Sequence, residues 1–434
     1  MQMLNARNSA VVLALLCAPG MAMATPFGMM DPRAMGMGGT GVSAGSTSSA
    51  AHFNPALLSV ARRKSATAFE ITAAVRASDP QDLVDDADRV ESAFTGVEDA
   101  LDAFNAGPTG NTPQRQAAAG QLASALGPFR DVFRTVSNKN LEVNAFASPL
   151  TIAVPGKDLG WALYGAARAD AGMRFVFAPG DDALLGSYQS AAAAYAASGS
   201  NADLTNLCAQ FGGGGGTTCD LEEPDFASHI DVRGVVVREI GMSFSREFHG
   251  RTMNWAFGIT PKYQKISTFD YSVNPQDEED IDADTGRKDY SSFNFDLGIA
   301  KDMGSGFRAG LVGKNMISRS YTTVLDNKIE LKPQYRLGLS HHSSWTTIAV
   351  DVDLNKTKPL AFEQESQFFG VGLELDVWNF VQLRLGYRGD LAGNYDGVPS
   401  IGLGLSLVWL HLDAAIARRG NDEVMGAVQL GLRF

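Results

Sequence analysis

The sequence predicts an all-β protein whose antiparallel strands, about 14 in number, close into a transmembrane β-barrel. Three observations carry this prediction. Apolar and polar residues alternate with a period of two over most of the chain from about residue 140. Long and short connections alternate between the expected strands. The last expected strand ends on an aromatic residue, Phe434, in phase with its apolar side.

The composition narrows the function before any motif is considered. The 434 residues are 45% hydrophobic and 19% charged, with a net charge of −12. No stretch approaches the roughly 18 to 20 apolar residues that a membrane-spanning helix needs. The acidic balance argues against a nucleic-acid partner, whose phosphates require clustered Lys and Arg. The low charge and the 46 glycines are also unusual for a cytosolic enzyme.

Residues 1–24 have the pattern of a secretory signal peptide. A basic residue precedes an apolar stretch from Ala10 to Ala18, and a small-residue motif predicts cleavage after Ala24. Cys208 and Cys219 are then the only cysteines of the mature chain. In an oxidising compartment we expect them to form one disulfide.

Alternation defines the individual strands. In the last segment, residues such as Val428 and Leu430 face one side, whereas Gln429 and Arg433 face the other. The expected strands span residues 65–77, 140–154, 160–178, 230–248, 253–271, 290–302, 306–317, 331–342, 345–356, 367–377, 381–390, 399–407, 410–418 and 424–434.

The connections distinguish a membrane barrel from a soluble β-sandwich, which alternates in the same way. Loops after odd-numbered strands are mostly long, as at 78–139, 179–229 and 272–289. Those after even-numbered strands are tight turns, as at 343–344 and 408–409. An outer-membrane barrel with both ends in the periplasm sorts its loops in this manner, and Greek-key crossings do not.

The two faces of each strand fit the same prediction. The outer side of a barrel meets lipid and must be apolar, whereas the lumen can hold charge, glycine and water. The candidate lumenal charges are Asp351, Asp353, Glu374, Arg384 and Arg388. They either line a transport path or form an internal salt-bridge network. Aromatic residues near strand ends suit interfacial girdles, namely Trp255, Tyr263, Tyr335, Trp345, Trp378, Tyr387 and Trp409.

Two insertions interrupt the strands, and both are expected outside the cell. Residues 79–137 show the apolar spacing of two amphipathic helices, which should pack on each other or over the barrel mouth. Residues 179–229 combine an Ala-rich helix from Ser187 to Ala197 with the glycine run Gly212 to Gly216. The expected Cys208–Cys219 disulfide would hold this second loop together.

Several local motifs match functional sites without the context that those sites need. Residues 36–41 match the dinucleotide pattern G-x-G-x-x-G, and residues 41–45 match the hydrolase pattern G-x-S-x-G, but neither lies between a strand and a helix. The acidic run 277–284 fits no EF-hand. His341 and His342 are neighbours in a strand and face opposite ways. We therefore expect no catalytic residues, no cofactor and no metal.

The N-terminal region resembles the hatch of the FadL superfamily, which opens with a Gly-rich stretch followed by an N-P-A motif. The matching residues are Gly36, Gly38, Gly39, Gly41, Asn54, Pro55 and Ala56. The resemblance implies a 14-stranded outer-membrane barrel for hydrophobic compounds, formed by residues 65–434, with residues 25–64 as a hatch in the lumen. Small residues suit a plug inside a narrow barrel.

Within that superfamily, the chain is most similar to the conjugal transfer TraF-like outer-membrane proteins. The similarity lies in R-A-M-G-M-G-G-T-G-V, H-F-N-P-A-L-L, H-L-D-A-A and the final Q-L-G-L-R-F. It implies the outer membrane of a Gram-negative bacterium, with lipid around the barrel. The terminal Phe434 resembles the signal that barrel-assembly machinery recognises.

The sequence leaves three functions open. The first is passive transport of hydrophobic small molecules, with the hatch shifting to open a path. The second is a structural or partner-binding role in a conjugal transfer or secretion apparatus, with the helices of residues 79–137 as the docking surface. The third is a general porin.

Overall fold

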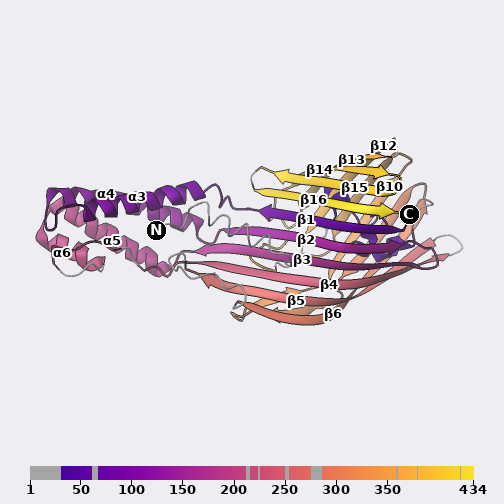
Figure 1. Cartoon of the computed structure of the whole chain (residues 1–434), viewed down its shortest axis with the longest axis horizontal. Coiled ribbons are helices and arrows are strands. Elements are labelled where there is room, and N and C mark those ends of the chain that lie inside the picture. Colours follow the sequence, from indigo (N-terminus) through magenta and orange to yellow (C-terminus); the bar gives the residue numbers. More distant parts are fainter. Residues whose placement is uncertain are drawn as a thin grey trace.

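A computed structural model describes most of the chain. The described residues are 31–60, 67–211, 216–222, 225–249, 254–274, 286–357, 360–378, 380–420 and 422–434. The expected signal peptide, the acidic run 277–284 and most of the glycine run lie outside them. Over these residues the sheet is a closed barrel of 14 antiparallel strands (Figure 1).

The strands follow one another around the barrel in chain order, and β1 closes the ring against β16, where Ala68 lies opposite Arg433. Their bounds are β1 Ala68–Ser78, β2 Asn140–Val154, β3 Gly160–Val176, β4 His229–His249, β5 Asn254–Val273, β6 Arg287–Gly304, β7 Phe307–Lys314, β10 Gln334–His342, β11 Thr346–Asp353, β12 Phe368–Val377, β13 Val381–Asp390, β14 Val398–Leu407, β15 Leu410–Arg419 and β16 Glu423–Arg433. The predicted fold class and strand number are confirmed.

Several predicted strand ends differ from the structure by up to three residues, and one of these differences has a clear structural cause. The strand expected from residue 331 begins at Gln334, because residues Lys328–Leu331 form β9 and pair with β8, Arg319–Thr322. Pro333 separates the two strands, and proline cannot donate a backbone hydrogen bond to a sheet. The resulting small hairpin was not predicted.

The barrel has an apolar outer surface and a polar lumen. Ile71, Leu385 and Ile401 are more than half exposed on the outside, whereas Glu70 and Arg384 point inward and are each 2% exposed. All seven aromatic residues expected in girdles are exposed. No helix in the described part of the chain is long and apolar enough to span a membrane.

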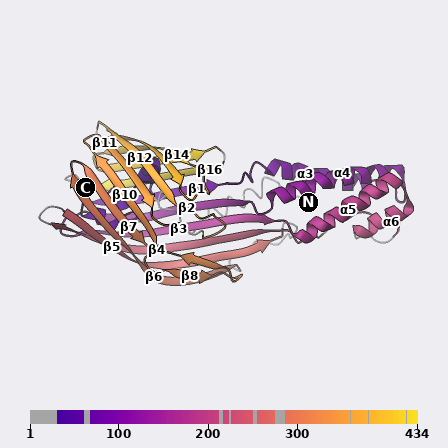
Figure 2. The same ribbon diagram turned by 180° about the vertical axis from the view of Figure 1, so that it is seen from behind.

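The barrel wall is much taller on one side than on the other. Strands β2 to β6 have 15 to 21 residues, whereas β7 and β10 to β15 have eight to ten (Figure 2). The β8–β9 hairpin covers part of the taller wall. Its Tyr321 and Ile329 pack against Val235 and Ile266, which face the lumen from β4 and β5.

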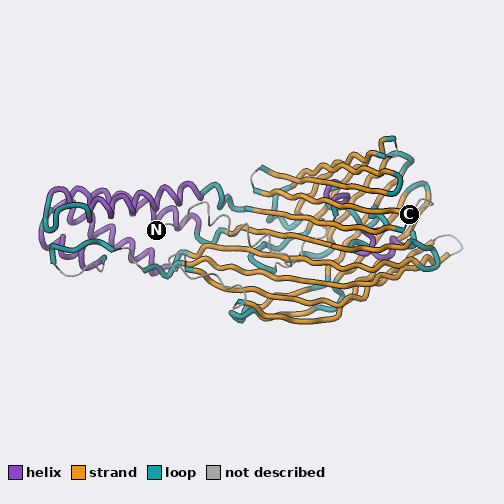
Figure 3. The backbone as a smooth tube through the Cα atoms, in the orientation of Figure 1, coloured by secondary structure: helices purple, strands orange, loops and turns teal. Residues whose placement is uncertain are grey.

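Four helices form a head beyond the end of the barrel that is opposite the C-terminus (Figure 3). They are α3 Ala87–Asn105, α4 Pro113–Val136, α5 Pro179–Ser198 and α6 Asn201–Gln210. Helices α3 and α4 pack on each other, and α5 is longer than the predicted helix, whereas α6 was not predicted. The head has its own apolar core, in which Phe104, Leu122, Tyr195 and Leu204 are fully buried.

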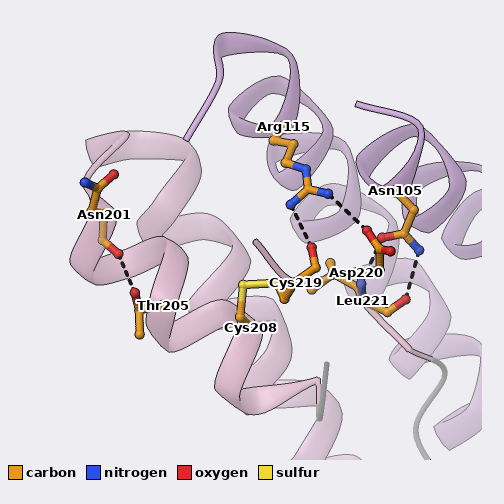
Figure 4. The surroundings of a disulfide bond; sticks show 8 residues. All are labelled: Asn105, Arg115, Asn201, Thr205, Cys208, Cys219, Asp220 and Leu221. Atoms are coloured by element: carbon orange, nitrogen blue, oxygen red, sulfur yellow. Dashed lines mark hydrogen bonds and ion pairs between the residues drawn. A yellow bond between two sulfur atoms is a disulfide. The ribbon is translucent and has the colours of Figure 1, made fainter. Parts of the chain in front are cut away.

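The disulfide between Cys208 and Cys219 is present and closes the second insertion (Figure 4). Beside it, the fully buried Arg115 donates a hydrogen bond to the Cys219 carbonyl (2.7 Å) and pairs with Asp220 (3.1 Å). Asn105 exchanges two hydrogen bonds with the backbone of Leu221. The disulfide therefore joins α6 to a segment that is anchored on α3 and α4.

Replacing both cysteines with serine should destabilise the head and leave the barrel intact. A disulfide that closes a loop of this size contributes about 2–3 kcal/mol. Hydrogen exchange in residues 179–210 should become faster, while the shift in gel mobility between boiled and unboiled protein should stay unchanged. An equal increase of exchange in head and barrel would contradict a separate head core.

The head should also lose stability in acid through Asp86. This carboxylate accepts hydrogen bonds from Lys139 and Arg89, both at 2.6 Å, and the Lys139 bond in particular lowers its pKa. The stabilisation is complete above the unfolded-state pKa of about 3.9 and is lost as pH falls through the lower folded-state pKa. Helical melting followed between about pH 5 and pH 2 should therefore depend less on pH in Asp86→Asn. Equal pH dependence in both proteins would refute this.

Candidate functional site: a hatch in the lumen

Residues 31–60 form a hatch inside the barrel, near the end that carries the C-terminus (Figure 3). Its first helix, α2 Pro32–Gly36, begins where the Asp31 side chain accepts the Ala34 amide hydrogen bond, and it lies beside β13 to β16. The short helix η3, Pro55–Leu58, lies beside β4 to β6, on the opposite side of the ring. The hatch thus crosses the lumen.

The wall around the hatch is lined by inward-facing glycines, which we call the glycine girdle. Its members are Gly160, Gly258, Gly298, Gly310, Gly338, Gly370, Gly372, Gly386 and Gly402. A Cβ atom on Gly258 would lie 2.4 Å from the Ala56 nitrogen, and one on Gly370 would lie 2.2 Å from the Gly38 oxygen. Because any side chain would collide with backbone, the girdle lets the hatch touch the wall.

The glycines predicted to belong to the hatch have distinct local roles. Gly38 and Gly39 have φ angles of +68° and +86°, which favour glycine. Gly36 lies against the girdle, because its Cβ would come within 2.9 Å of the Gly402 Cα. A Cβ on Gly41 would collide with the Phe53 ring at 2.4 Å.

Side chains of the wall bind the backbone of the hatch. Asp351 accepts hydrogen bonds from the amides of Gly41 (2.8 Å) and Val42 (2.9 Å). Lys314 donates to the His52 carbonyl at 2.6 Å, and Ser245 donates to the Ala56 carbonyl at 3.2 Å. An irregular segment buried in a lumen would otherwise leave these backbone groups unpaired. The wall therefore replaces the hydrogen bonds that a sheet would supply.

The predicted Asn54-Pro55-Ala56 motif is a contact between hatch and wall. The Asn54 amide donates to the Ile299 carbonyl on β6 (3.1 Å), and its oxygen accepts the Ala56 amide (3.1 Å). Pro55 fills the space left by Gly298, where a Cβ would lie 2.9 Å from the proline ring. The motif is thus an N-cap for η3 and also an anchor on the wall.

The predicted lumenal charges all lie inside the barrel and form ion pairs or hydrogen bonds. Arg33 of the hatch binds both oxygens of Glu374, at 2.7 and 2.8 Å, and Glu374 also accepts from Arg384 at 2.7 Å. Asp353 pairs with Arg336 on β10 at 2.6 Å. Together with Asp351, these side chains connect hatch and wall within a salt-bridge network.

A second ionic cluster fills the lumen on the head side of the hatch. Arg76 pairs with Glu423 (2.6 Å), Glu142 (3.4 Å) and Glu363 (3.6 Å), and Arg388 also reaches Glu423, at 2.6 Å. Of these residues, only Arg388 was predicted as a site residue. Arg76 and Glu142 lie on the neighbouring strands β1 and β2, 66 positions apart, and Glu363 lies in a loop. Glu423 is 347 positions from Arg76 on β16, so only closure of the ring brings these two together.

Sequence reasoning also missed the glycine girdle and the hatch cation Arg33. A signal for the girdle exists, since glycines recur at alternate positions in phase with inward polar residues, as at Gly370 and Gly372. No local pattern shows that Arg33 reaches Glu374, 341 positions away.

Substituting a girdle glycine should displace the hatch from its contact with the wall. In Gly386→Ala, the new Cβ would lie 2.0 Å from the Gly38 nitrogen, which costs about 1–3 kcal/mol of overpacking. We expect higher conductance in planar bilayers and trypsin cleavage after Arg33. The matched control is Gly426→Ala, because a Cβ there meets no atom within 4 Å. Equal conductance in the two variants would contradict the role of the girdle.

Comparison of the fold with solved structures finds similar barrels at low sequence identity. The toluene transporter TodX of P. putida has a TM-score of 0.45 and 10% identity, covering 94% of this chain and 99% of that one. The CymD monoaromatic hydrocarbon channel has a TM-score of 0.49 and 10% identity, with 95% and 99% covered. A Pseudomonas aeruginosa FadL homologue has a TM-score of 0.46 and 10% identity, with 96% and 99% covered.

Fewer matches are found when the amino-acid sequence, rather than the fold, is compared with known proteins. No curated protein matches the chain. A family model described as "F plasmid transfer operon, TraF, protein" matches residues 51–353, which extend from the hatch to β11 and include the whole head. This match confirms the predicted TraF-like resemblance, and the chain belongs to that family.

Proposed function

We propose that the protein is an outer-membrane channel for the passive transport of hydrophobic small molecules, closed at rest by its hatch. The observation that carries the proposal is a plug held in the lumen by non-covalent contacts alone. Its anchors, such as Arg33 with Glu374 and Asp351 with Gly41, are hydrogen bonds and ion pairs that can break and re-form. The plug can therefore move without leaving the barrel.

The outer surface supports a location in the outer membrane. Exposed apolar side chains cover the strands, and closure of the barrel gives every strand of the ring two hydrogen-bonded neighbours, as a hydrocarbon environment requires. Trp345, Trp378 and Trp409 lie in or beside the tight turns, at the end of the barrel that carries Phe434, where an aromatic girdle belongs. In this orientation the head stands outside the cell, and Phe434 is available to the barrel-assembly machinery.

An apolar seam between hatch and wall supports a hydrophobic cargo. Leu57 and Leu58 of the hatch belong to one buried cluster with Phe146 and Tyr164, which face the lumen from β2 and β3. The His52 ring stacks edge-on against both aromatic rings, at 5.5 and 4.6 Å. If the hatch shifts, the surfaces that part along this seam are apolar on both sides.

Deleting residues 25–60 should raise the uptake of a labelled hydrophobic compound into proteoliposomes. Removing the hatch eliminates the only plug that the described residues show in the periplasmic half of the lumen. Asp351→Asn should show a smaller increase, because it weakens a single anchor. The Gly426→Ala variant serves as the control. Uptake that stays at the level of protein-free liposomes in all variants would refute transport.

A second candidate function is partner binding by the head, and the charge distribution favours it. Residues 79–137 and 178–228 contain 17 acidic and four basic side chains, a net charge of −13, whereas the whole chain carries −12. Almost all of the net charge therefore lies on a separate helical unit that the barrel does not need for closure. Such a unit is suited to a basic partner within a transfer or secretion apparatus.

Excising residues 80–137 would separate this function from transport. We expect loss of partner capture in pull-down experiments, with the barrel still shifting in gel mobility when boiled. The matched control is the double cysteine-to-serine variant, which loosens the head without changing its charge. Partner capture by the excised protein would contradict the docking function.

A further inference from the structure

A segment between β11 and β12 crosses the lumen above the hatch. This strap, residues 360–367, starts from the short side of the wall and reaches the tall side. Leu360 packs against Val235 and Val237 of β4. The backbone amide of Gln364 donates a hydrogen bond to the hydroxyl oxygen of Tyr395 (3.0 Å), in the loop between β13 and β14. The strap is thus held from both sides of the ring.

The tip of the strap places an aromatic ring between two guanidinium groups. The Arg174 and Arg233 carbons lie 4.5 and 4.8 Å from the centre of the Phe362 ring. Both arginines face the lumen from adjacent strands, β3 and β4. Cation–π contacts of this kind favour any flat aromatic group, not phenylalanine alone.

The next residue places a carboxylate in a site made by the wall. Glu363 accepts a hydrogen bond from the Asn144 amide (2.8 Å) and lies 3.6 Å from the Arg76 guanidinium. Two donors in this region have no hydrogen-bond partner among the described residues, Nη2 of Arg76 and Nε of Arg174. Arg76 is only 2% exposed, so its unpaired donor is costly and points to an additional oxygen ligand.

A cavity adjoins the strap but cannot hold a passenger while the strap is in place. Arg76, Arg168, Glu363 and Phe368 are among the residues that line it. Its volume of about 40 Å³ is room for only a few water molecules. An organic molecule therefore fits at this place only if the strap moves aside.

We propose that Arg76, Asn144, Arg174 and Arg233 form a binding site for small aromatic carboxylates, which Phe362 and Glu363 of the strap occupy in the closed channel. The ring of the ligand replaces Phe362, and its carboxylate replaces Glu363. The exchange leaves the number of negative charges around Arg76 unchanged. A carboxylate that is not tethered to the strap can also turn an oxygen toward the unpaired donor of Arg76. The strap therefore competes with the ligand for this site, and only a ligand with both an aromatic ring and a carboxylate displaces it.

This inference rests on the proposed channel function and narrows its cargo from hydrophobic compounds in general to amphipathic ones. Competition with the strap lowers the apparent affinity, because only the fraction of molecules with the strap displaced can bind. Weakening the strap should therefore strengthen ligand binding. A simple pore would not respond in this way.

The test is calorimetric titration of the full chain in detergent with 3-phenylpropionate. We expect Phe362→Ala and Glu363→Gln each to bind about tenfold more tightly than the unaltered protein. The double variant Arg174→Gln with Arg233→Gln should bind at least tenfold more weakly. Glu365→Gln is the matched control, because Glu365 lies on the strap but pairs only with the half-exposed Lys356 at 3.8 Å among the described contacts of its carboxylate. It should leave the affinity unchanged.

Two analogues test the chemistry of the site. The neutral 3-phenylpropanamide lacks the carboxylate, and 3-cyclohexylpropionate lacks the aromatic ring. Both should bind at least fivefold more weakly than 3-phenylpropionate to Glu363→Gln. Equal binding of the three compounds, or no gain of affinity in either strap variant, would overturn the proposal. A gel-mobility shift on boiling verifies that each variant has a folded barrel.

The outcomes separate this inference from the proposed function. Tight binding of 3-phenylpropionate without uptake by the hatch-deleted protein would support the site and refute transport. Uptake of a neutral hydrophobic compound without any binding of the acid would support transport and refute the site.

Discussion

The structure depends on the close approach of an irregular chain segment to a regular wall. A hatch with little secondary structure can remain in a lumen only if its backbone groups find partners there. The glycine girdle allows contact distance, and side chains such as Asp351, Lys314 and Ser245 supply the hydrogen bonds. Each part needs the other, because a Cβ at Gly310 would lie 2.4 Å from the backbone oxygen of Val42, whose amide Asp351 binds.

This constraint explains why the salt bridges of the lumen are unevenly placed. Near the hatch they join plug to wall, as in the pair Arg33–Glu374, and so they stabilise the closed state. Above the hatch they join wall strands to one another and to the strap, as in the contacts of Arg76. The same chemistry therefore fills the lumen at two levels, tightly packed at the hatch and more polar at the strap.

The barrel could be predicted almost completely from the sequence, because period-two alternation and loop length are local properties. The strands of the structure lie within three residues of those expected. The hairpin strand Lys328–Leu331 was not predicted. It alternates like a barrel strand but pairs with the segment just before it, and alternation alone does not show which segment is the partner. The helix α6 is only ten residues long and follows directly after another helix, so its apolar residues span too few turns to show a helical repeat.

The candidate site could be predicted only in part, for a physical reason. The alternation within a single strand shows which residues face the lumen, so Glu374 and Arg384 could be predicted. These two pair with each other on neighbouring strands. The contacts of Arg76 depend on topology, because ring closure places β1 next to β16 and the strap reaches β2. Glu142 and Glu363 accordingly looked like ordinary polar residues until the barrel brought both to Arg76. Sequence patterns define the faces of the wall, whereas topology defines which faces meet.

Because the strands have unequal lengths, the rim of the barrel on the head side is higher on one side than on the other. A difference of about ten residues corresponds to a step of ~25 Å at 3.3 Å per residue and a strand tilt of ~40°. The rim is therefore oblique, low beside β11 to β15 and high beside β3 to β5. The connections to the head leave from β1 to β4. In the proposed orientation, the low edge is the part of the rim nearest to the outer leaflet. The head, with its α4 ~36 Å long, extends beyond the rim from the other side of the barrel.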